Sequence, residues 1–271
     1  MKIGTTSFTF RTALSDERRA PSLLSVVERC REIGLERLQV CENARPLSLS
    51  ARQWERLIEQ SAGLGVEIQL GCKTLSEDEI DRSLVRAAAT PARLLRVVLE
   101  EDAGRPPSRA FVSDFVASLP PKLARHNVRV AIENHFDVPA RVLAEAVNQH
   151  DSPLLGFCVD SANSLRSFEP AAYVLAQLGP RAFCCHVKDY KVVGHQLGFS
   201  VVGAPLGEGN LPLDEFLDGV LDGKQTPDLP DLFVETWVIS KGEREADVAE
   251  DWRWLSASVQ TLRARLDARG Y

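Results

Sequence analysis

The chain has 271 residues, of which 44% are hydrophobic and 26% charged, and this balance is typical of a globular protein with a buried core. Its 38 acidic and 32 basic residues give a formal charge of −6, which argues against a phosphate-bearing partner such as nucleic acid or an anionic membrane. No apolar run reaches 18 residues, and residues 1–7 lack the apolar segment of a signal peptide. We therefore expect a cytoplasmic protein that binds neither nucleic acid nor membranes.

Short apolar runs alternate with longer amphipathic segments along the whole chain. The apolar runs, which predict strands, cover residues 3–8, 36–40, 66–71, 94–99, 128–133, 154–160, 182–187 and 232–235. The amphipathic segments, which predict helices, cover residues 21–33, 51–63, 77–89, 109–126, 139–149, 170–178, 213–221 and 246–268. The predicted order is therefore a strand followed by a helix, repeated along the chain.

This alternation indicates the fold class. The strand runs are apolar almost throughout, which is typical of strands that are buried on both faces of a parallel sheet. Their number and the chain length match a (β/α)₈ TIM barrel. A doubly wound open sheet is the competing arrangement, but no glycine-rich phosphate-binding turn follows any of the strands. We predict an α/β fold with one domain, a single (β/α)₈ barrel over residues 1–271.

The longest interval without a predicted element lies between residues 188 and 211. It contains five glycines together with apolar side chains such as Leu197 and Phe199. A loop of more than about 15 residues inside a compact domain is usually functional or disordered. The apolar content argues against disorder, so we expect an ordered loop that acts as an active-site lid.

Late strand runs end in side chains that can bind a metal ion: Glu133, Asp160, His186 and Glu235. In a parallel barrel these strand ends meet at the carboxyl-terminal rim, where barrel enzymes have their active sites. Three carboxylates and an imidazole are costly to bury together unless a divalent cation neutralises them. We expect one such ion, Mn²⁺, Mg²⁺, Co²⁺ or Zn²⁺. Independent turn or cap residues are the alternative, but they would not explain equivalent positions on adjacent strands.

Several short motifs surround these residues. They are Ala-Ile-Glu-Asn-His at 131–135, Val-Asp-Ser-Ala-Asn at 159–163, His-Val-Lys-Asp at 186–189, Gly-Glu-Gly at 207–209 and Val-Glu at 234–235. In this order and spacing they resemble the xylose-isomerase-like barrel superfamily of sugar isomerases and epimerases, and the similarity spans the chain from its first strand. The resemblance implies that the metal ligands are Glu133, Asp160, His186 and Glu235.

The resemblance also implies a reaction. In the family, the metal holds a sugar carbonyl and the adjacent hydroxyl and stabilises an enediolate, while two glutamates serve as base and acid. For this chain it assigns those catalytic roles to Glu133 and Glu235. The leading expectation is a divalent-metal-dependent isomerase or epimerase of a small sugar or sugar acid, working through a metal-bound enediolate. Homo-oligomers are frequent in the family, so the resemblance allows for one here, although the sequence does not determine the oligomeric state.

Other functions are compatible with the same residues. The glycine-rich segment 194–209 resembles a branch of the family that acts on oxo-sugar acids and includes decarboxylases, which form the enediolate by losing CO₂. A non-catalytic barrel that binds a sugar or metabolite is a further alternative. Base-excision endonucleases of the family need more histidine ligands and a basic face, which five histidines and a charge of −6 do not supply.

Polar residues near the same rim are candidates for substrate binding: Lys73, His135, Asn163, Lys188 and His195. Asn163 stands where keto-sugar 3-epimerases of the family carry a histidine. Lys188, Lys191 and His195 could bind an anion such as a sugar carboxylate or a phosphate. For Lys73 and His135, a solvated or turn position is the alternative. Trp237 either lines the pocket or packs in the core.

Overall fold

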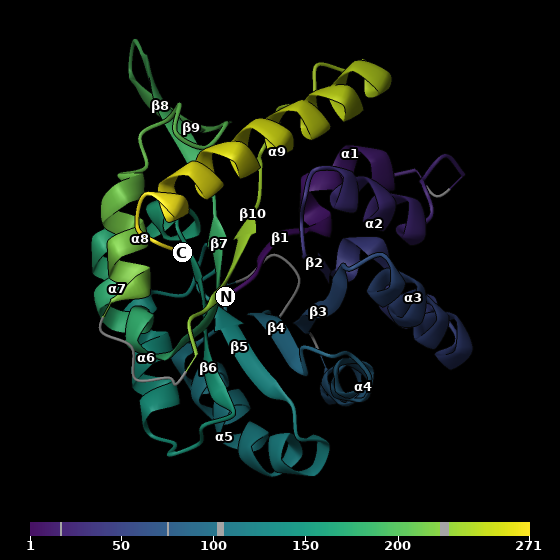
Figure 1. Cartoon of the computed structure of the whole chain (residues 1–271). Helices are drawn as coiled ribbons and strands as arrows, with labels where there is room; N and C mark the ends of the chain where they lie inside the picture. The colour runs from purple at the N-terminus through teal and green to yellow at the C-terminus, as the bar shows by residue number, and fades with distance from the viewer. Residues whose placement is uncertain (17, 75, 102–105, 223–227) are drawn as a thin grey trace.

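The computed structural model describes residues 1–16, 18–74, 76–101, 106–222 and 228–271. In these residues, eight parallel strands follow one another around a closed barrel, and the last strand pairs with the first (Figure 1). The barrel strands are β1 (Ile3–Thr6), β2 (Arg37–Val40), β3 (Glu67–Thr74), β4 (Leu94–Leu99), β5 (Arg129–Glu133), β6 (Leu155–Asp160), β7 (Ala182–Val187) and β10 (Asp231–Val234). The predicted (β/α)₈ TIM barrel is confirmed.

Helices surround the barrel, and the predicted ones are found with ends within two residues of the expected positions. The helices are α1 (Arg11–Leu14), which the sequence pattern does not predict, and the predicted α2 (Leu23–Glu32), α3 (Ala51–Gly63), α4 (Glu77–Ala88), α5 (Arg109–His126), α6 (Ala140–Asn148), α7 (Ala171–Leu178), α8 (Leu213–Leu221) and α9 (Arg244–Asp267). Serine hydroxyls cap the first turns of α2, α3, α4 and α5. In the part of the chain that the structure describes, no helix is long and apolar enough to cross a membrane.

Successive residues of a strand face opposite sides, and this alternation divides the apolar side chains into two clusters. The large cluster between strands and helices includes Ile132, Val159, Cys185 and Val234. Their preceding neighbours belong to a smaller, separate cluster: Ala131, Cys158, Cys184 and Phe233. In each case, the residue after the member of the large cluster lies on the same face as the smaller cluster. These residues are Glu133, Asp160, His186 and Glu235. The alternation thus places the predicted ligands inside the barrel.

Three strand ends differ from the expected ones. β1 ends at Thr6 and not at residue 8, because a short 3-10 helix begins at Ser7. Lys73 lies within β3, which continues to Thr74, and not beyond the strand as predicted. Glu235 directly follows β10. Its backbone N–H still donates to the carbonyl of Val187 (3.2 Å), so the ladder to β7 holds Glu235 at the rim.

The interval that we expected to be a loop contains a hairpin. β8 (Asp189–His195) pairs antiparallel with β9 (Gly198–Ala204), and Gln196 and Leu197 form the two-residue turn. The expectation of a loop was wrong because the valines of this segment favour strands, and a two-residue turn is a common hairpin connection. Figure 1 shows the hairpin projecting beyond the helices.

The buried Asp189 anchors the chain that follows the hairpin. Its carboxylate accepts backbone hydrogen bonds from Gly207 (2.8 Å), Gly209 (3.0 Å) and Leu211 (2.9 Å). A Cβ atom at Gly209 would overlap this carboxylate and the carbonyl oxygen of Tyr190, so the position requires glycine. The His-Val-Lys-Asp and Gly-Glu-Gly motifs are therefore joined in one structural unit next to the barrel rim.

Candidate metal centre and active site

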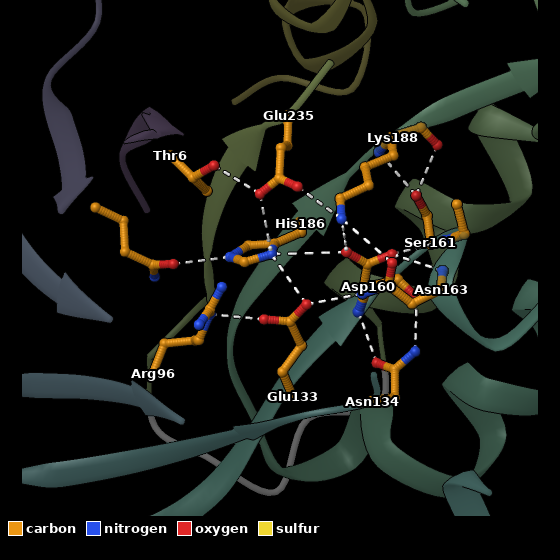
Figure 2. Close-up of polar contacts among 12 residues, drawn as sticks. Thr6, Arg96, Glu133, Asn134, Asp160, Ser161, Asn163, His186, Lys188 and Glu235 are labelled. Carbon is orange, nitrogen blue, oxygen red and sulfur yellow. Dashed lines mark hydrogen bonds and ion pairs between the residues drawn. The ribbon is translucent and has the colours of Figure 1, made fainter. Parts of the chain in front are cut away.

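Four side chains at the carboxyl-terminal end of the barrel point toward one another (Figure 2). The Nδ1 atom of His186 lies 3.5 Å from Glu133 Oε1, 3.6 Å from Asp160 Oδ2 and 3.6 Å from Glu235 Oε2. All four residues are buried, and the most exposed of them, Glu235, is 6% exposed. The structure therefore brings together the four residues that the sequence predicts as metal ligands.

The geometry around His186 suits a divalent cation. Its Nδ1 atom is buried and has no hydrogen-bond partner among the described residues. The three carboxylate oxygens are too distant for hydrogen bonds. However, ligand atoms about 2.0–2.2 Å from a tetrahedral ion lie about 3.3–3.6 Å from one another. The three oxygens therefore lie at distances from Nδ1 that ligands of one metal ion have, and the donor set of three carboxylates and one imidazole suits such an ion.

The other ring nitrogen of His186 is fixed by β2. Its Nε2 atom lies 2.9 Å from Oε1 of Gln39, and the amide of Gln39 donates to Gln69. Because an amide oxygen accepts, we place a proton on Nε2, so Nδ1 is the nitrogen that can give up its proton and bind a cation. Burial alone would lower the pKa of His186, but Glu133 and Asp160 raise it to about 10. The negative field that favours a proton at this nitrogen also favours a metal ion.

Lys188 supplies a positive charge to two of the carboxylates. Its Nζ atom lies 2.8 Å from Asp160 Oδ2, 2.7 Å from Glu235 Oε1 and 3.3 Å from Asn163 Oδ1. Burial alone would lower the pKa of Lys188, but Asp160 and Glu235 raise it, so the amine is protonated at neutral pH. Lys188 and Asn163, two predicted substrate-binding residues, thus lie within the cluster.

Arg96 of β4 is a site residue that the strand-end pattern does not predict. Its Nε atom forms an ion pair with Glu133 Oε2 at 2.7 Å, and both side chains are almost fully buried. Asn163 donates to the other oxygen of Glu133 (2.8 Å). Burial alone would raise the pKa of Glu133, but Arg96 and His186 hold it well below its ordinary value. An arginine in the middle of an apolar strand was the available signal, because a buried charge needs a partner.

Further hydrogen bonds orient the ligand carboxylates. Asn134 accepts from the backbone N–H of Asp160 (2.7 Å) and donates to its carbonyl (2.9 Å). The Asp160 carboxylate accepts from two backbone N–H groups of the following turn, both at 2.9 Å. The hydroxyl of Thr6 donates to Glu235 Oε2 (2.6 Å). These contacts fix the carboxylates before any ligand binds, which lowers the cost of organising the site.

A second combination of donors includes a cysteine. Ligand atoms of Glu133, Cys158 and His186 lie within 4.8 Å of one another, and all three residues are buried. Burial and the neighbouring Cys184 raise the pKa of the Cys158 thiol well above its ordinary value, which disfavours the thiolate that binds metal best. Glu133 and His186 are common to both combinations.

Comparison with known proteins identifies the family of this barrel. The chain matches the xylose isomerase-like TIM barrel family over residues 27–258. It belongs to this family. A 3-oxo-isoapionate decarboxylase of Pectobacterium atrosepticum is 25% identical over 268 residues, which cover 98% of this chain and 96% of the relative. A crystal structure of an IOLI protein with a zinc atom superimposes with a TM-score of 0.72 at 15% identity, covering 99% of both chains. A D-psicose 3-epimerase in the presence of D-fructose gives a TM-score of 0.70 at 14% identity, covering 97% of both chains.

Two other predicted substrate-binding residues of this xylose isomerase-like barrel lie beside the cluster. Lys73 and His135 line a neighbouring hollow of about 290 Å³. The Lys73 ammonium pairs with Glu100 (2.6 Å), and burial lowers the pKa of His135. They are therefore near the rim, but they do not join the group around His186.

His195 lies apart from the metal centre. It is exposed at the end of β8, and its Nε2 atom is 2.8 Å from the hydroxyl of Ser200. At about 3.3 Å per strand residue, the end of β8 lies about 20 Å from its beginning. Lys191 is also exposed, whereas Lys188 is buried. The structure therefore does not assemble these three residues into one anion-binding group.

Proposed function

We propose that this protein is a divalent-metal-dependent lyase that removes CO₂ from an oxo-sugar acid. The observation that carries this proposal is that both oxygens of each ligand glutamate are already held by a donor or cation. The groups that face these oxygens are Arg96 and Asn163 at Glu133, and Lys188 and Thr6 at Glu235. The similarity to a 3-oxo-isoapionate decarboxylase, over nearly the whole of both chains, supports the same reaction class.

Donors on both oxygens weaken a carboxylate as a base, because they stabilise its charged form. Epimerisation needs a base that takes a proton from carbon and an acid that returns one on the opposite face. Decarboxylation needs no such base, since the electron pair comes from the bond to the departing CO₂. Carboxylates held by cations therefore suit the loss of CO₂ better than the removal of a proton.

In a 3-oxo sugar acid, the bond between the carboxylate carbon and C2 breaks, and its electron pair moves toward the C3 ketone. This releases CO₂ and leaves an enediolate. The Lys188 ammonium stabilises the developing negative charge, returns a proton to C2 and regains its own from solvent. When bound, a divalent ion would supply Lewis acidity at the substrate carbonyl. The residues that would hold the ion are Glu133, Asp160, His186 and Glu235.

Measurement of CO₂ release from a panel of 3-oxo sugar acids tests the proposed function. The protein is first treated with a chelator and then supplied with Mn²⁺, Mg²⁺, Co²⁺ or Zn²⁺. We expect release that depends on the added ion and is lost in Glu235→Gln. Glu208→Gln, which changes an exposed glutamate of the Gly-Glu-Gly motif, is the matched control. Release that is independent of metal, or equal in both variants, would contradict the proposal.

Isomerisation or epimerisation of a small sugar, the leading expectation from the sequence, is the second candidate. The observation that favours it is the near-equal approach of Glu133 (3.5 Å) and Glu235 (3.6 Å) to the same nitrogen of His186. Two carboxylates around one site are the groups that a two-base proton transfer needs. Incubation with D-fructose or D-psicose in D₂O separates the candidates. Deuterium at the epimerised carbon without CO₂ release from the acid panel would favour the epimerase.

We also propose that residues 1–271 act as one barrel domain on a small-molecule substrate and assemble as a homo-oligomer. The continuous strand order around the barrel supports the single domain. Limited proteolysis tests it, because one domain should leave one resistant core. Light scattering gives the number of copies in the assembly.

A further inference from the structure

A hollow of about 350 Å³ lies beside the metal centre. Two of its lining residues connect it with the centre. Asn163 donates to Glu133 (2.8 Å), and the ring of Trp237 lies 5.1 Å from the Nζ atom of Lys188. A substrate bound at the centre could therefore extend directly into this hollow.

Aromatic side chains from separate parts of the chain line the hollow: Phe136 after β5, Phe168 after the short helix Asn163–Ser167, Phe199 of β9 and Trp237 after β10. Phe168 is 85% exposed and Phe199 is 62% exposed. Leaving two large rings in water forgoes the free energy of burial. Because both rings line one hollow that lies beside the metal centre, we take a bound ligand to be what covers them.

The backbone at Phe168 points in the same direction. Its φ of 56° and ψ of 29° lie in the left-handed region, which bulky residues rarely adopt. A position that only ended the short helix would favour glycine or asparagine. Arg45, Arg93 and Asn127 share this left-handed backbone. Such positions are enriched at ligand-binding sites, and Phe168 is the one among these four whose ring lines the hollow.

We propose that this hollow is a subsite for the distal part of the substrate, and that this part is a ring with an apolar face. The acid group of the substrate binds at the metal centre, while the ring stacks on Phe168 and Phe199 beside Trp237. Arg166 also lines the hollow, and its guanidinium pairs with Asp137 (3.1 Å) while 63% of the side chain is exposed, so it can donate to oxygens on the ring. This subsite rests on the proposed function and narrows its substrate to a ring-bearing sugar acid.

Calorimetric titration of the purified protein with three probes tests the subsite. D-gluconate has an acid group and no ring, methyl β-D-glucuronide adds a sugar ring, and phenyl β-D-glucuronide adds an aromatic ring. We expect the ring-bearing probes to bind about 10-fold more tightly than gluconate. Phe168→Ser and Phe199→Ser should each reduce this advantage about 5-fold and leave gluconate affinity unchanged. Leu197→Ser, at the tip of the same hairpin and 97% exposed, is the matched control.

The outcomes distinguish a sugar ring from an aromatic ring, and they test the subsite separately from the proposed function. An advantage of the methyl probe over gluconate identifies a sugar ring, and a gain only with the phenyl probe identifies an aromatic ring. Equal affinities for all probes, or an advantage that survives both phenylalanine substitutions, overturn the subsite. A changed number of copies in Phe199→Ser, measured by light scattering, also overturns it, because a second copy would then cover the rings. Ring preference without CO₂ release from the acid panel rejects the proposed function alone.

Discussion

Arg96 is the cation that faces Glu133 inside the barrel, and replacing it by methionine removes the charge while keeping a long side chain. The two side chains are 3% and 1% exposed, and their atoms lie 2.7 Å apart. Removing one partner of a buried ion pair costs about 3–5 kcal/mol, because the other charge stays buried without compensation. His186 and Asn163 still face the other oxygen of Glu133. We therefore expect Arg96→Met to lower the free energy of unfolding by about 3 kcal/mol at neutral pH.

The loss of stability should depend on pH. Burial alone would raise the pKa of Glu133, but Arg96 is the main group that holds it below its ordinary value. A carboxylate whose folded pKa is lowered stabilises the protein above its unfolded pKa of about 4.3, and this contribution is lost as the pH falls through the folded pKa. In Arg96→Met the folded pKa rises. The difference in stability between native and variant protein should therefore be largest near neutral pH and shrink in acid.

Urea unfolding followed by circular dichroism, near pH 7 and near pH 4.5, measures both effects. Arg109→Met is the matched control, because Arg109 pairs with Glu145 (2.8 Å) on the surface, where the side chains are 59% and 42% exposed. Such a pair contributes about 0–1 kcal/mol. Equal destabilisation by the two substitutions, or a deficit for Arg96→Met that is the same at both pH values, would refute the reasoning.

Three further substitutions test other parts of the site. Lys188→Met should lower CO₂ release about 100-fold or more while metal content is kept, and loss of the metal would instead show a structural role. Gly209→Ala should lower the free energy of unfolding by about 1–3 kcal/mol, because its methyl group would overlap the Asp189 carboxylate. Urea unfolding measures this effect against Gly198→Ala, where a Cβ meets no atom within 4 Å, and equal stability would contradict it. Cys158→Ser should leave metal content unchanged, and a lost ion would favour the thiol-containing set of ligands.

The fold and the ligand set are predictable from the sequence for one physical reason. Strands of a parallel barrel start and end together, so a polar residue that ends an apolar run must lie at the common rim. The two-residue period of a strand then decides which face it occupies. Glu133 shares its face with Ala131, whereas Ile132 between them packs against the helices. The same reasoning applies to Asp160, the last residue of β6, and to His186, the last but one of β7.

The remaining parts of the site depend on information that strand ends do not carry. Arg96 and Gln39 lie within strands, where only their polarity in a buried position indicates a role. The hairpin at 189–204 has a turn of Gln196 and Leu197, which lacks the usual asparagine–glycine signal. The aromatic hollow combines rings from segments far apart in the sequence, and only the closed barrel brings these segments together.

The central claim is that Glu133, Asp160, His186 and Glu235 bind one divalent ion. Plasma mass spectrometry of the purified native protein, Asp160→Ala and His186→Ala measures this most directly, with His150→Ala outside the site as the control. We predict about one Mn, Mg, Co or Zn ion per chain in the native and control proteins and none in the two site variants. A native protein that holds no ion even after incubation with Mn²⁺, or variants that keep the native metal content, would contradict the claim.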